Sequence, residues 1–186
     1  MTVILFSNKM HIHSLKIILT IKRFCFLSVL ILLLPGYLSS QPQVLFSPKG
    51  GIRDRIIKAC NLCKTSIDVA IFDFTSGDLA DALVRAKERG IALRVIADPK
   101  RGADKNSETP FLQKKGVNLR LLPGKGRGIM HNKFAIFDGK ILLTGSYNWT
   151  ESAEKYNWEN VIILDDTAVV KVFRDEFEKM WKKARE

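Results

Sequence analysis

The chain has 186 residues, of which 46% are hydrophobic and 26% are charged, and its mean hydropathy is zero. This length suits one globular domain with a targeting segment, and the composition excludes wholesale disorder, collagen-like repeats and a polytopic membrane protein. Lysine and arginine number 30 against 19 acidic residues, which gives a formal net charge of +11. Such an excess favours anionic partners, either nucleic acid or anionic lipid.

Residues 1–40 have the pattern of a targeting segment. An apolar run over residues 24–34 follows a Lys-Arg pair and is ended by Pro-Gly. A positive flank, a short apolar core and small residues after it are typical of a secretory signal peptide. We expect a signal peptide here, or alternatively an uncleaved anchor through residues 17–34, and a domain formed by residues 41–186. Either interpretation places the domain outside the cytosol, in the periplasm or secreted.

Beyond residue 40, strand-like and helix-like apolar patterns alternate. We expect strands at 44–46, 66–74, 91–97, 117–122 and 160–164, and a hairpin of 133–137 and 141–144 around an Asp-Gly turn. We expect helices at 49–63, 76–89, 109–115 and 167–183, and loops at 98–108 and 123–128. The Ser47-Pro48 pair is a typical helix start and should begin the first of these helices. The order predicts an α/β fold with a mixed central sheet and helices on both faces.

Cys60 and Cys63 form a Cys-x-x-Cys pair late in the first expected helix. A zinc site would need two further ligands, and the sequence offers no second pair or spare histidine. A redox pair would stand at the start of a helix rather than late in it. We interpret the two cysteines as structural residues, with a disulfide as the alternative and a metal site as the least favoured reading.

Five polar side chains are spaced so that a folded strand or turn would bring them together. His131 and Lys133 are two residues apart at the start of a strand, so their side chains leave the same face. Ser146 and Asn148 are again two apart, just after the hairpin, and Glu159 stands at the start of the last strand. His131 is the single histidine after residue 40.

A base, a cation, two neutral hydrogen-bonding groups and a carboxylate suit the chemistry of a phosphodiester. His131 would attack phosphorus as neutral imidazole and form a phosphohistidine. Lys133 would offset the charge of the non-bridging oxygens, while Ser146 and Asn148 would hold the phosphoryl group. The sequence has neither a Walker-type glycine loop nor a cluster of acids suited to a divalent metal, so we expect no cofactor and no metal.

The pattern His131-x-Lys133-x4-Asp138, followed by Gly-Ser-x-Asn-Trp and a downstream Glu-Asn, resembles the HKD motif of the phospholipase D superfamily. The closest branch is the small, exported, single-motif bacterial nucleases, which are similar to mitochondrial cardiolipin hydrolase-like endonucleases. The resemblance covers most of residues 44–183. It implies the phospholipase D-like α/β sandwich with one HKD motif per chain.

The resemblance also implies a role for each motif residue. His131 is the nucleophile or the acid, Lys133 binds phosphate, and Ser146 and Asn148 complete the phosphate pocket. Glu159 orients a histidine. Asp138 belongs to the catalytic motif but is implied to be more supportive than chemical. It precedes a glycine, so it can equally be the first central residue of a type I′ turn.

The domain has a single histidine, whereas the proposed reaction needs both a nucleophile and an acid. In-line displacement needs a nucleophile on one side of phosphorus and an acid for the leaving oxygen on the other. A two-fold homodimer would place two copies of His131 across one site. The resemblance implies the same arrangement, so we expect a homodimer with the active site at its two-fold interface.

Three functions remain open from the sequence. The first is a metal-independent, nonspecific endonuclease on DNA or RNA, since residues 41–186 retain 26 basic and 19 acidic side chains, or +7. A basic loop with Lys125 and Arg127 would form a rim that attracts phosphate backbone. The second is a phospholipase D that hydrolyses phospholipid head groups with the same chemistry. The third is a catalytically idle nucleic-acid-binding module.

Overall fold

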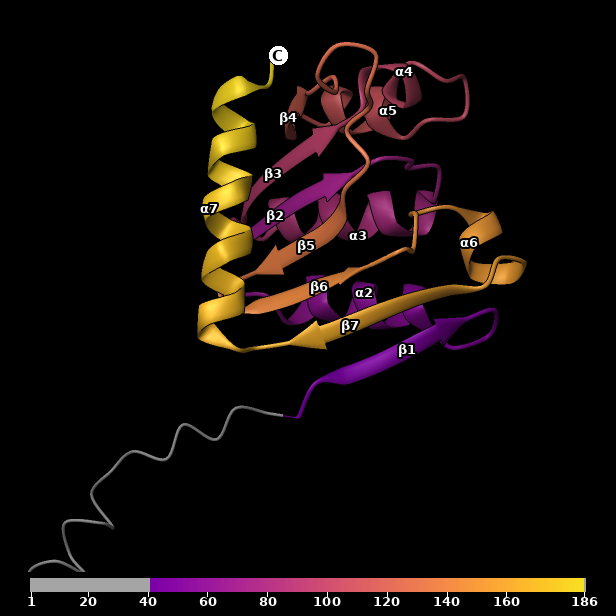
Figure 1. Cartoon of the computed structure of the whole chain (residues 1–186), viewed down its shortest axis with the longest axis vertical. Helices are drawn as coiled ribbons and strands as arrows, with labels where there is room; N and C mark the ends of the chain where they lie inside the picture. The colour runs from indigo at the N-terminus through magenta and orange to yellow at the C-terminus, as the bar shows by residue number, and fades with distance from the viewer. Residues whose placement is uncertain (1–40, 186) are drawn as a thin grey trace, which may run out of the picture. The chain divides into compact units, whose positions relative to one another are not determined.

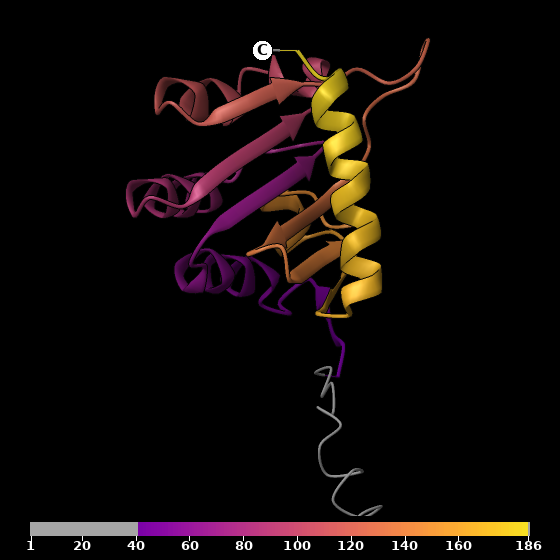
Figure 2. The ribbon, with the colours of Figure 1, turned by 90° about the vertical axis from the view of Figure 1, so that its left-hand side faces the viewer.

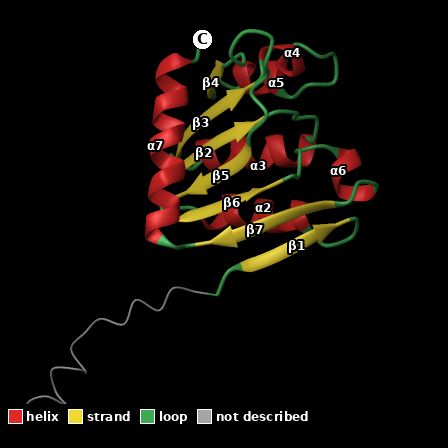
Figure 3. Ribbon diagram, viewed as in Figure 1, coloured by secondary structure: helices red, strands yellow, loops and turns green. Residues whose placement is uncertain are grey.

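A seven-stranded mixed sheet runs through residues 41–185, the part of the chain that the computed structural model describes (Figures 1 and 3). The strand order is β1-β7-β6-β5-β2-β3-β4. The strands are β1 (Gln43–Ser47), β2 (Ser66–Ile71), β3 (Ala92–Ala97), β4 (Asn118–Leu121), β5 (Lys133–Phe137), β6 (Ile141–Gly145) and β7 (Glu159–Leu164). β2, β3 and β4 run parallel to one another, and the remaining neighbours are antiparallel. The expected signal peptide or anchor over residues 1–40 lies outside the described residues.

Helices cover both faces of this sheet, as the alternation of patterns predicted. They are α2 (Ile52–Leu62), α3 (Gly77–Glu88), α4 (Pro99–Gly102), α5 (Thr109–Lys114), α6 (Glu151–Lys155) and α7 (Thr167–Lys183). Figure 2 shows α7 along one face, with α2 and α3 on the other. Successive side chains of β5 point to opposite faces of the sheet. Phe134 and Ile136 pack in the hydrophobic cluster under α7, while Ala135 and Phe137 pack in the cluster under α2 and α3. None of the helices within residues 41–185 has the length and apolar character needed to cross a bilayer.

The first helix starts later than predicted. α2 begins at Ile52, because Lys49 and Gly51 have φ angles of 68° and 71°. Such left-handed residues cannot belong to a right-handed helix. Pro48 therefore lies in the turn before the helix and is not its first residue. The Ser47-Pro48 helix start was wrong.

Two short helices were not predicted. α4 lies inside the stretch 98–108 that was expected to be a loop, and the buried carboxylate of Asp98 caps it by accepting hydrogen bonds from the amides of Lys100 and Arg101 at 3.0 and 3.2 Å. α6 follows Thr150, whose hydroxyl accepts from the Ala153 amide at 3.1 Å. Both start with the side-chain cap that a helix N-terminus needs.

Cys60 and Cys63 are buried and both thiols are free. The Cys63 thiol donates hydrogen bonds to the Ser66 carbonyl at 3.0 Å and to the Asp138 carboxylate at 2.9 Å. This agrees with the interpretation of the pair as structural residues rather than with a disulfide.

Candidate active site

The predicted chemical residues gather at one edge of the sheet, on the right in Figure 1. β2, β3 and β6 end at this edge, while β5 and β7 begin there. The register pairs Ile71 at the end of β2 with Lys133 at the start of β5, and Gly145 with Val161. Ligand sites of α/β sheets typically lie beyond the carboxyl ends of parallel strands.

His131 and Lys133 converge on the ring of Phe72, which directly follows β2. The imidazole and phenyl centroids are 4.5 Å apart, and the Lys133 Nζ lies 4.9 Å from the Phe72 centroid. Lys133 Nζ also donates to the His131 carbonyl at 2.8 Å. The guanidinium of Arg101 lies 5.4 Å from the same ring. Three basic groups therefore surround one aromatic ring, which makes this edge attractive to an anion.

The surroundings favour the neutral form of His131. The residue is exposed, but partial loss of hydration lowers its pKa, and the charge of Lys133 lowers it further against the opposing effect of Asp98. Burial also lowers the pKa of Lys133, while the carboxylates of Glu159 and Asp73 act in the other direction. A larger share of neutral imidazole at physiological pH suits a nucleophile that must be reachable by substrate.

Ser146 and Glu159 are locked together across the β6–β7 pair. Ser146 Oγ donates to Glu159 Oε2 at 2.5 Å, and the Asn160 amide donates to Ser146 Oγ at 3.1 Å. Gly145 permits this approach, because a Cβ there would stand 2.1 Å from the Asn160 carbonyl oxygen. The other oxygen of Glu159 accepts from Asn157 Nδ2 at 3.1 Å. The hydroxyl predicted to bind phosphate is thus positioned by the carboxylate.

Asn148 is placed by its buried neighbours. Tyr147 and Trp149 point into the core with exposed fractions of 2% and 1%, so Ser146 and Asn148 alternate out of it. The Trp149 amide donates to the Asp73 carbonyl at 3.0 Å, which fixes the turn against the segment after β2. The Asn148 Oδ1 atom is buried without a hydrogen-bond partner in the part of the chain that the structure describes. Buried polar atoms left unpaired need a reason, and a ligand pocket is one.

The expected link from Glu159 to a histidine is not made within one chain. Among residues 41–185, the hydrogen bonds of this carboxylate come from Ser146 and Asn157, and none joins it to the His131 ring.

Asp138, predicted as part of the catalytic motif, does not join this group. It follows β5 at the end opposite to Lys133, about 16 Å away at the usual rise of a strand. With φ angles of 54° and 63°, Asp138 and Gly139 are the two central residues of a type I′ turn, which the Lys140 amide closes on the Phe137 carbonyl at 3.0 Å. The structure shows the turn, and it places the Asp138 carboxylate at the end of β5 opposite to His131.

The Asp138 carboxylate instead ties the β5–β6 turn to the connection between α2 and β2. Its Oδ1 accepts hydrogen bonds from the Cys63 thiol, the Thr65 hydroxyl and the amides of Lys64, Thr65 and Ser66. Burial alone would raise the pKa of Asp138, but these hydrogen bonds outweigh burial and lower the pKa well below its ordinary value. The aspartate of the motif is thus a structural clamp.

Replacing Asp138 by asparagine should destabilise the protein without slowing its chemistry. Asparagine tolerates the left-handed conformation, but it loses the charge that strengthens this set of hydrogen bonds. We expect the free energy of unfolding to fall by about 2 kcal/mol, or about 4–8 °C in Tm, in thermal unfolding experiments at neutral pH.

Because folding lowers the pKa of Asp138, its contribution is full above the ordinary carboxyl pKa and is lost as pH falls. The two proteins should therefore converge in acid. Asp175→Asn is the matched control, since within residues 41–185 that exposed carboxylate pairs with Lys171 alone, and its replacement should cost about 0.5 kcal/mol or less. An Asp138→Asn variant as stable as this control would contradict the clamp.

Three residues near the site were missed from the sequence: Phe72, Asp98 and Arg101. Asp98 is 1% exposed and accepts from the Met130 amide at 3.2 Å as well as from the first amides of α4. One buried carboxylate therefore holds both the helix that presents Arg101 and the residue before His131. The signal was present, because Asp-Pro after a strand is a typical helix start at a functional edge.

No group of three or more His, Cys, Asp or Glu side chains within residues 41–185 has the arrangement needed to hold a metal ion. The polar atoms gathered at the edge are those of His131, Lys133, Ser146, Asn148 and Glu159, with Arg101 beside them. Cations and neutral donors outnumber carboxylates in this set. Its chemistry fits an anionic substrate bound directly by side chains.

Comparison with known proteins places this arrangement in a family. Residues 56–181 match the family model described as cardiolipin synthase, PLD-like domain. Mitochondrial cardiolipin hydrolase of Mus musculus is 39% identical over 128 residues, which are 69% of this chain and 57% of that protein. The Homo sapiens protein of the same name is 38% identical over 128 residues, with 69% and 50% covered. The chain thus spans about half the length of the curated relatives it matches.

Two solved structures are similar over almost their whole length. Nuc from Salmonella typhimurium, a phospholipase D family member, superposes with a TM-score of 0.72 at 30% identity, covering 78% of this chain and 96% of that one. NucT from Helicobacter pylori gives 0.70 at 29% identity, with 78% and 98% covered. The mixed sheet, the family model and the relatives agree with the HKD motif in the sequence, and the chain belongs to the phospholipase D superfamily.

Proposed function

We propose that this protein is a phosphodiesterase that cleaves the backbone of DNA or RNA without sequence preference, through a phosphohistidine and without a metal ion. The observation that carries the proposal is the convergence of an exposed His131, with a lowered pKa, and Lys133 on the edge that also holds Ser146. A nucleophile, a cation and a fixed hydroxyl are the groups that phosphoryl transfer needs.

The reaction has two displacements. A neutral His131 nitrogen attacks phosphorus, the new N–P bond forms, and the bond from phosphorus to the leaving oxygen breaks. A second, protonated imidazole gives its proton to that oxygen and becomes neutral. It then takes a proton from water, whose oxygen attacks phosphorus and breaks the N–P bond. The products are an alcohol and a phosphate monoester, and both imidazoles return to their starting states.

We assign the second imidazole to the partner subunit's His131, in a two-fold homodimer. Residues 41–186 contain one histidine, and the reaction uses two. A closed two-fold dimer repeats the same surface, so an exposed His131 near the axis meets its own copy. Glu159, which lacks a histidine contact within one chain, would then orient the imidazole of the other subunit.

A nucleic acid is favoured as substrate by the charge around the site. Arg101 stands over Phe72 beside the two motif residues, and Lys125 and Arg127 are exposed in the loop before His131. Contacts of this kind bind the phosphate backbone and read no base, so binding should be strongly salt-dependent.

A phospholipase D reaction on lipid head groups is the second candidate. It is favoured by the relatives named mitochondrial cardiolipin hydrolase and by the description of the matching family model. The covalent chemistry would be identical, so only the rim of the site distinguishes the two substrates.

Plasmid DNA and phosphatidylcholine vesicles, each incubated in EDTA with wild type and with His131→Ala, test the assignment. We expect DNA to be nicked in EDTA by the wild type alone. Loss of activity in EDTA would contradict the metal-free reaction, and cleavage of lipid without cleavage of DNA would make the second candidate the function.

We also propose that the domain acts outside the cytosol, in the periplasm or secreted. The support is the signal-peptide pattern of residues 1–40, with an anchor through residues 17–34 as the alternative.

A further inference from the structure

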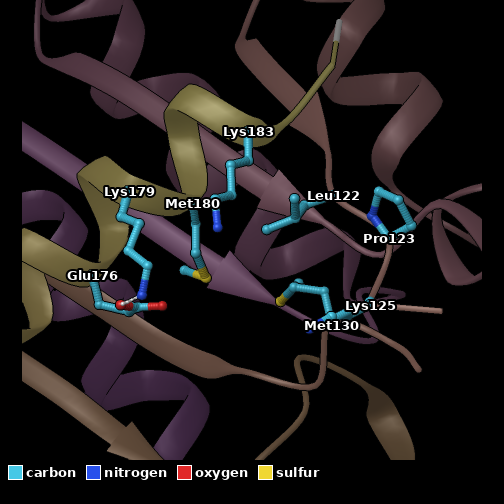
Figure 4. A pocket seen from close by; sticks show the side chains of 9 residues that line it. Leu122, Pro123, Lys125, Met130, Glu176, Lys179, Met180 and Lys183 are labelled. Carbon is cyan, nitrogen blue, oxygen red and sulfur yellow. Dashed lines mark hydrogen bonds and ion pairs between the residues drawn. The ribbon is translucent and has the colours of Figure 1, made fainter.

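A groove of about 430 Å³ lies between the C-terminal half of α7 and the loop before His131 (Figure 4). This volume is within the usual range of small-ligand sites. Its floor is apolar and consists of Leu122, Met130 and Met180. Figure 4 shows the side chains of Met130 and Met180 pointing toward each other from the loop and from the helix. The groove is thus a shallow channel with a flexible, polarizable floor.

The groove lies beside the active site, on the face of the sheet that α7 covers. Met130 lines it and directly precedes His131. On the other side of the histidine, Asn132 Nδ2 donates to the Met180 sulfur at 3.4 Å. Met130 therefore lines the groove and Asn132 contacts one of its lining residues, while the side chains of His131 and Lys133 leave the other face. Consecutive Cα atoms are about 3.8 Å apart, so a polymer with its phosphodiester at His131 would pass around the start of β5 to reach the groove.

Lysines stand on both walls. Lys125 comes from the loop, and Lys179 and Lys183 come from α7, one helical turn or about 6 Å apart along the axis. This spacing is close to that of successive phosphates along one strand. Lys179 is paired with Glu176 at 3.0 Å, whereas Lys125 and Lys183 form no ion pair with any of residues 41–185. Two free cations therefore face an apolar floor from opposite sides.

We propose that this groove binds a single nucleic acid strand next to the phosphodiester at His131, with phosphates on Lys125 and Lys183 and sugars and bases over the methionines. The assignment rests on the proposed function. Concave shape favours a strand over a membrane, because a strand can lie between two lysine walls while a bilayer surface is too broad to enter. The volume holds a short piece of one strand.

The test compares two double variants with the same loss of charge. Lys125→Gln with Lys183→Gln removes the free groove cations. Lys140→Gln with Lys182→Gln removes one exposed lysine from the β5–β6 turn and the neighbour of Lys183 on α7, neither of which lines the groove. Each pair is made with His131→Ala so that the probe is not consumed. Fluorescence anisotropy then follows a labelled single-stranded oligonucleotide from about 50 to 200 mM salt.

For the groove pair, we expect the slope of log K against log salt to shrink by about 1.4, or about 0.7 per lost phosphate contact, and affinity to fall about tenfold at low salt. The control pair should keep the slope within about 0.5. Equal slopes for the two pairs would contradict strand binding in the groove. The same conclusion would follow if the groove pair bound vesicles containing phosphatidylglycerol more weakly while its binding to the oligonucleotide stayed unchanged.

Hydrolysis of a small chromogenic phosphodiester distinguishes an effect on strand binding in the groove from an effect on the chemical step. With His131 intact, Lys183→Gln alone should hydrolyse this substrate at the wild-type rate, because the substrate is too short to reach the C-terminal half of α7. A loss on this substrate equal to the loss on the oligonucleotide would assign Lys183 to the chemistry and contradict a strand-binding groove. If wild type hydrolyses no phosphodiester while the slopes still differ, the proposed function fails and the groove remains a nucleic acid site.

Discussion

Replacing His131 by alanine should reduce kcat for phosphodiester hydrolysis by about 10⁴-fold or more. The side chain serves twice in the proposed dimer, as the nucleophile in one subunit and as the acid in the other. Its removal therefore ends both the covalent step and the protonation of the leaving oxygen. Lys133, Ser146 and Asn148 would still bind phosphate, so substrate affinity should change much less than turnover.

The covalent step itself is measured with a substrate carrying labelled phosphorus, quenched during turnover in alkali, where a phosphohistidine survives. We expect label on the wild-type protein and none on His131→Ala. Asp138→Asn, a change in the same motif at the far end of β5, should retain both the label and the turnover. Unchanged activity in His131→Ala would support the idle binding module, and the absence of label on an active wild type would contradict the covalent path.

The pH dependence of kcat/KM should be bell-shaped, with its two limbs on either side of a maximum near the ordinary histidine pKa of about 6.5. The nucleophilic copy of His131 must be neutral, so activity is lost as pH falls below its pKa. The acidic copy must be protonated, so activity is lost as pH rises above its pKa. Because partial loss of hydration and then Lys133 lower the pKa of His131 within one chain, the limb that reports the nucleophilic copy moves toward acid. Each limb should fall about tenfold per pH unit.

Initial rates on the chromogenic phosphodiester from pH 4 to pH 10 measure this curve, and its two limbs belong to the coupled pair rather than to either subunit. Asp138→Asn should give the same curve within the range where it stays folded. A rate that rises monotonically to pH 10, or full activity in a strictly monomeric preparation, would contradict a pair of imidazoles shared by two subunits.

Much of the fold follows from local sequence pattern. The helix at 167–183 and the hairpin around Asp138-Gly139 were predicted at or near their observed bounds, because helical periodicity and an Asp-Gly turn are both local signals. The start of α2 was missed for a related reason. Nothing in Ser47-Pro48 reveals that Lys49 and Gly51 take left-handed angles, since that is decided by how β1 turns into the helix.

The sequence by itself determined the family and predicted the chemical residues, because the spacing in His131-x-Lys133 follows from strand alternation and can be recognised without a structure. The tertiary structure decided where each residue acts. Strand direction sends Asp138 to the far end of β5, and the parallel strands bring Phe72 and Arg101 beside His131. The groove between α7 and the loop joins residues that lie about fifty positions apart. Such contacts between distant segments depend on how helices and strands pack, which no short stretch of sequence encodes.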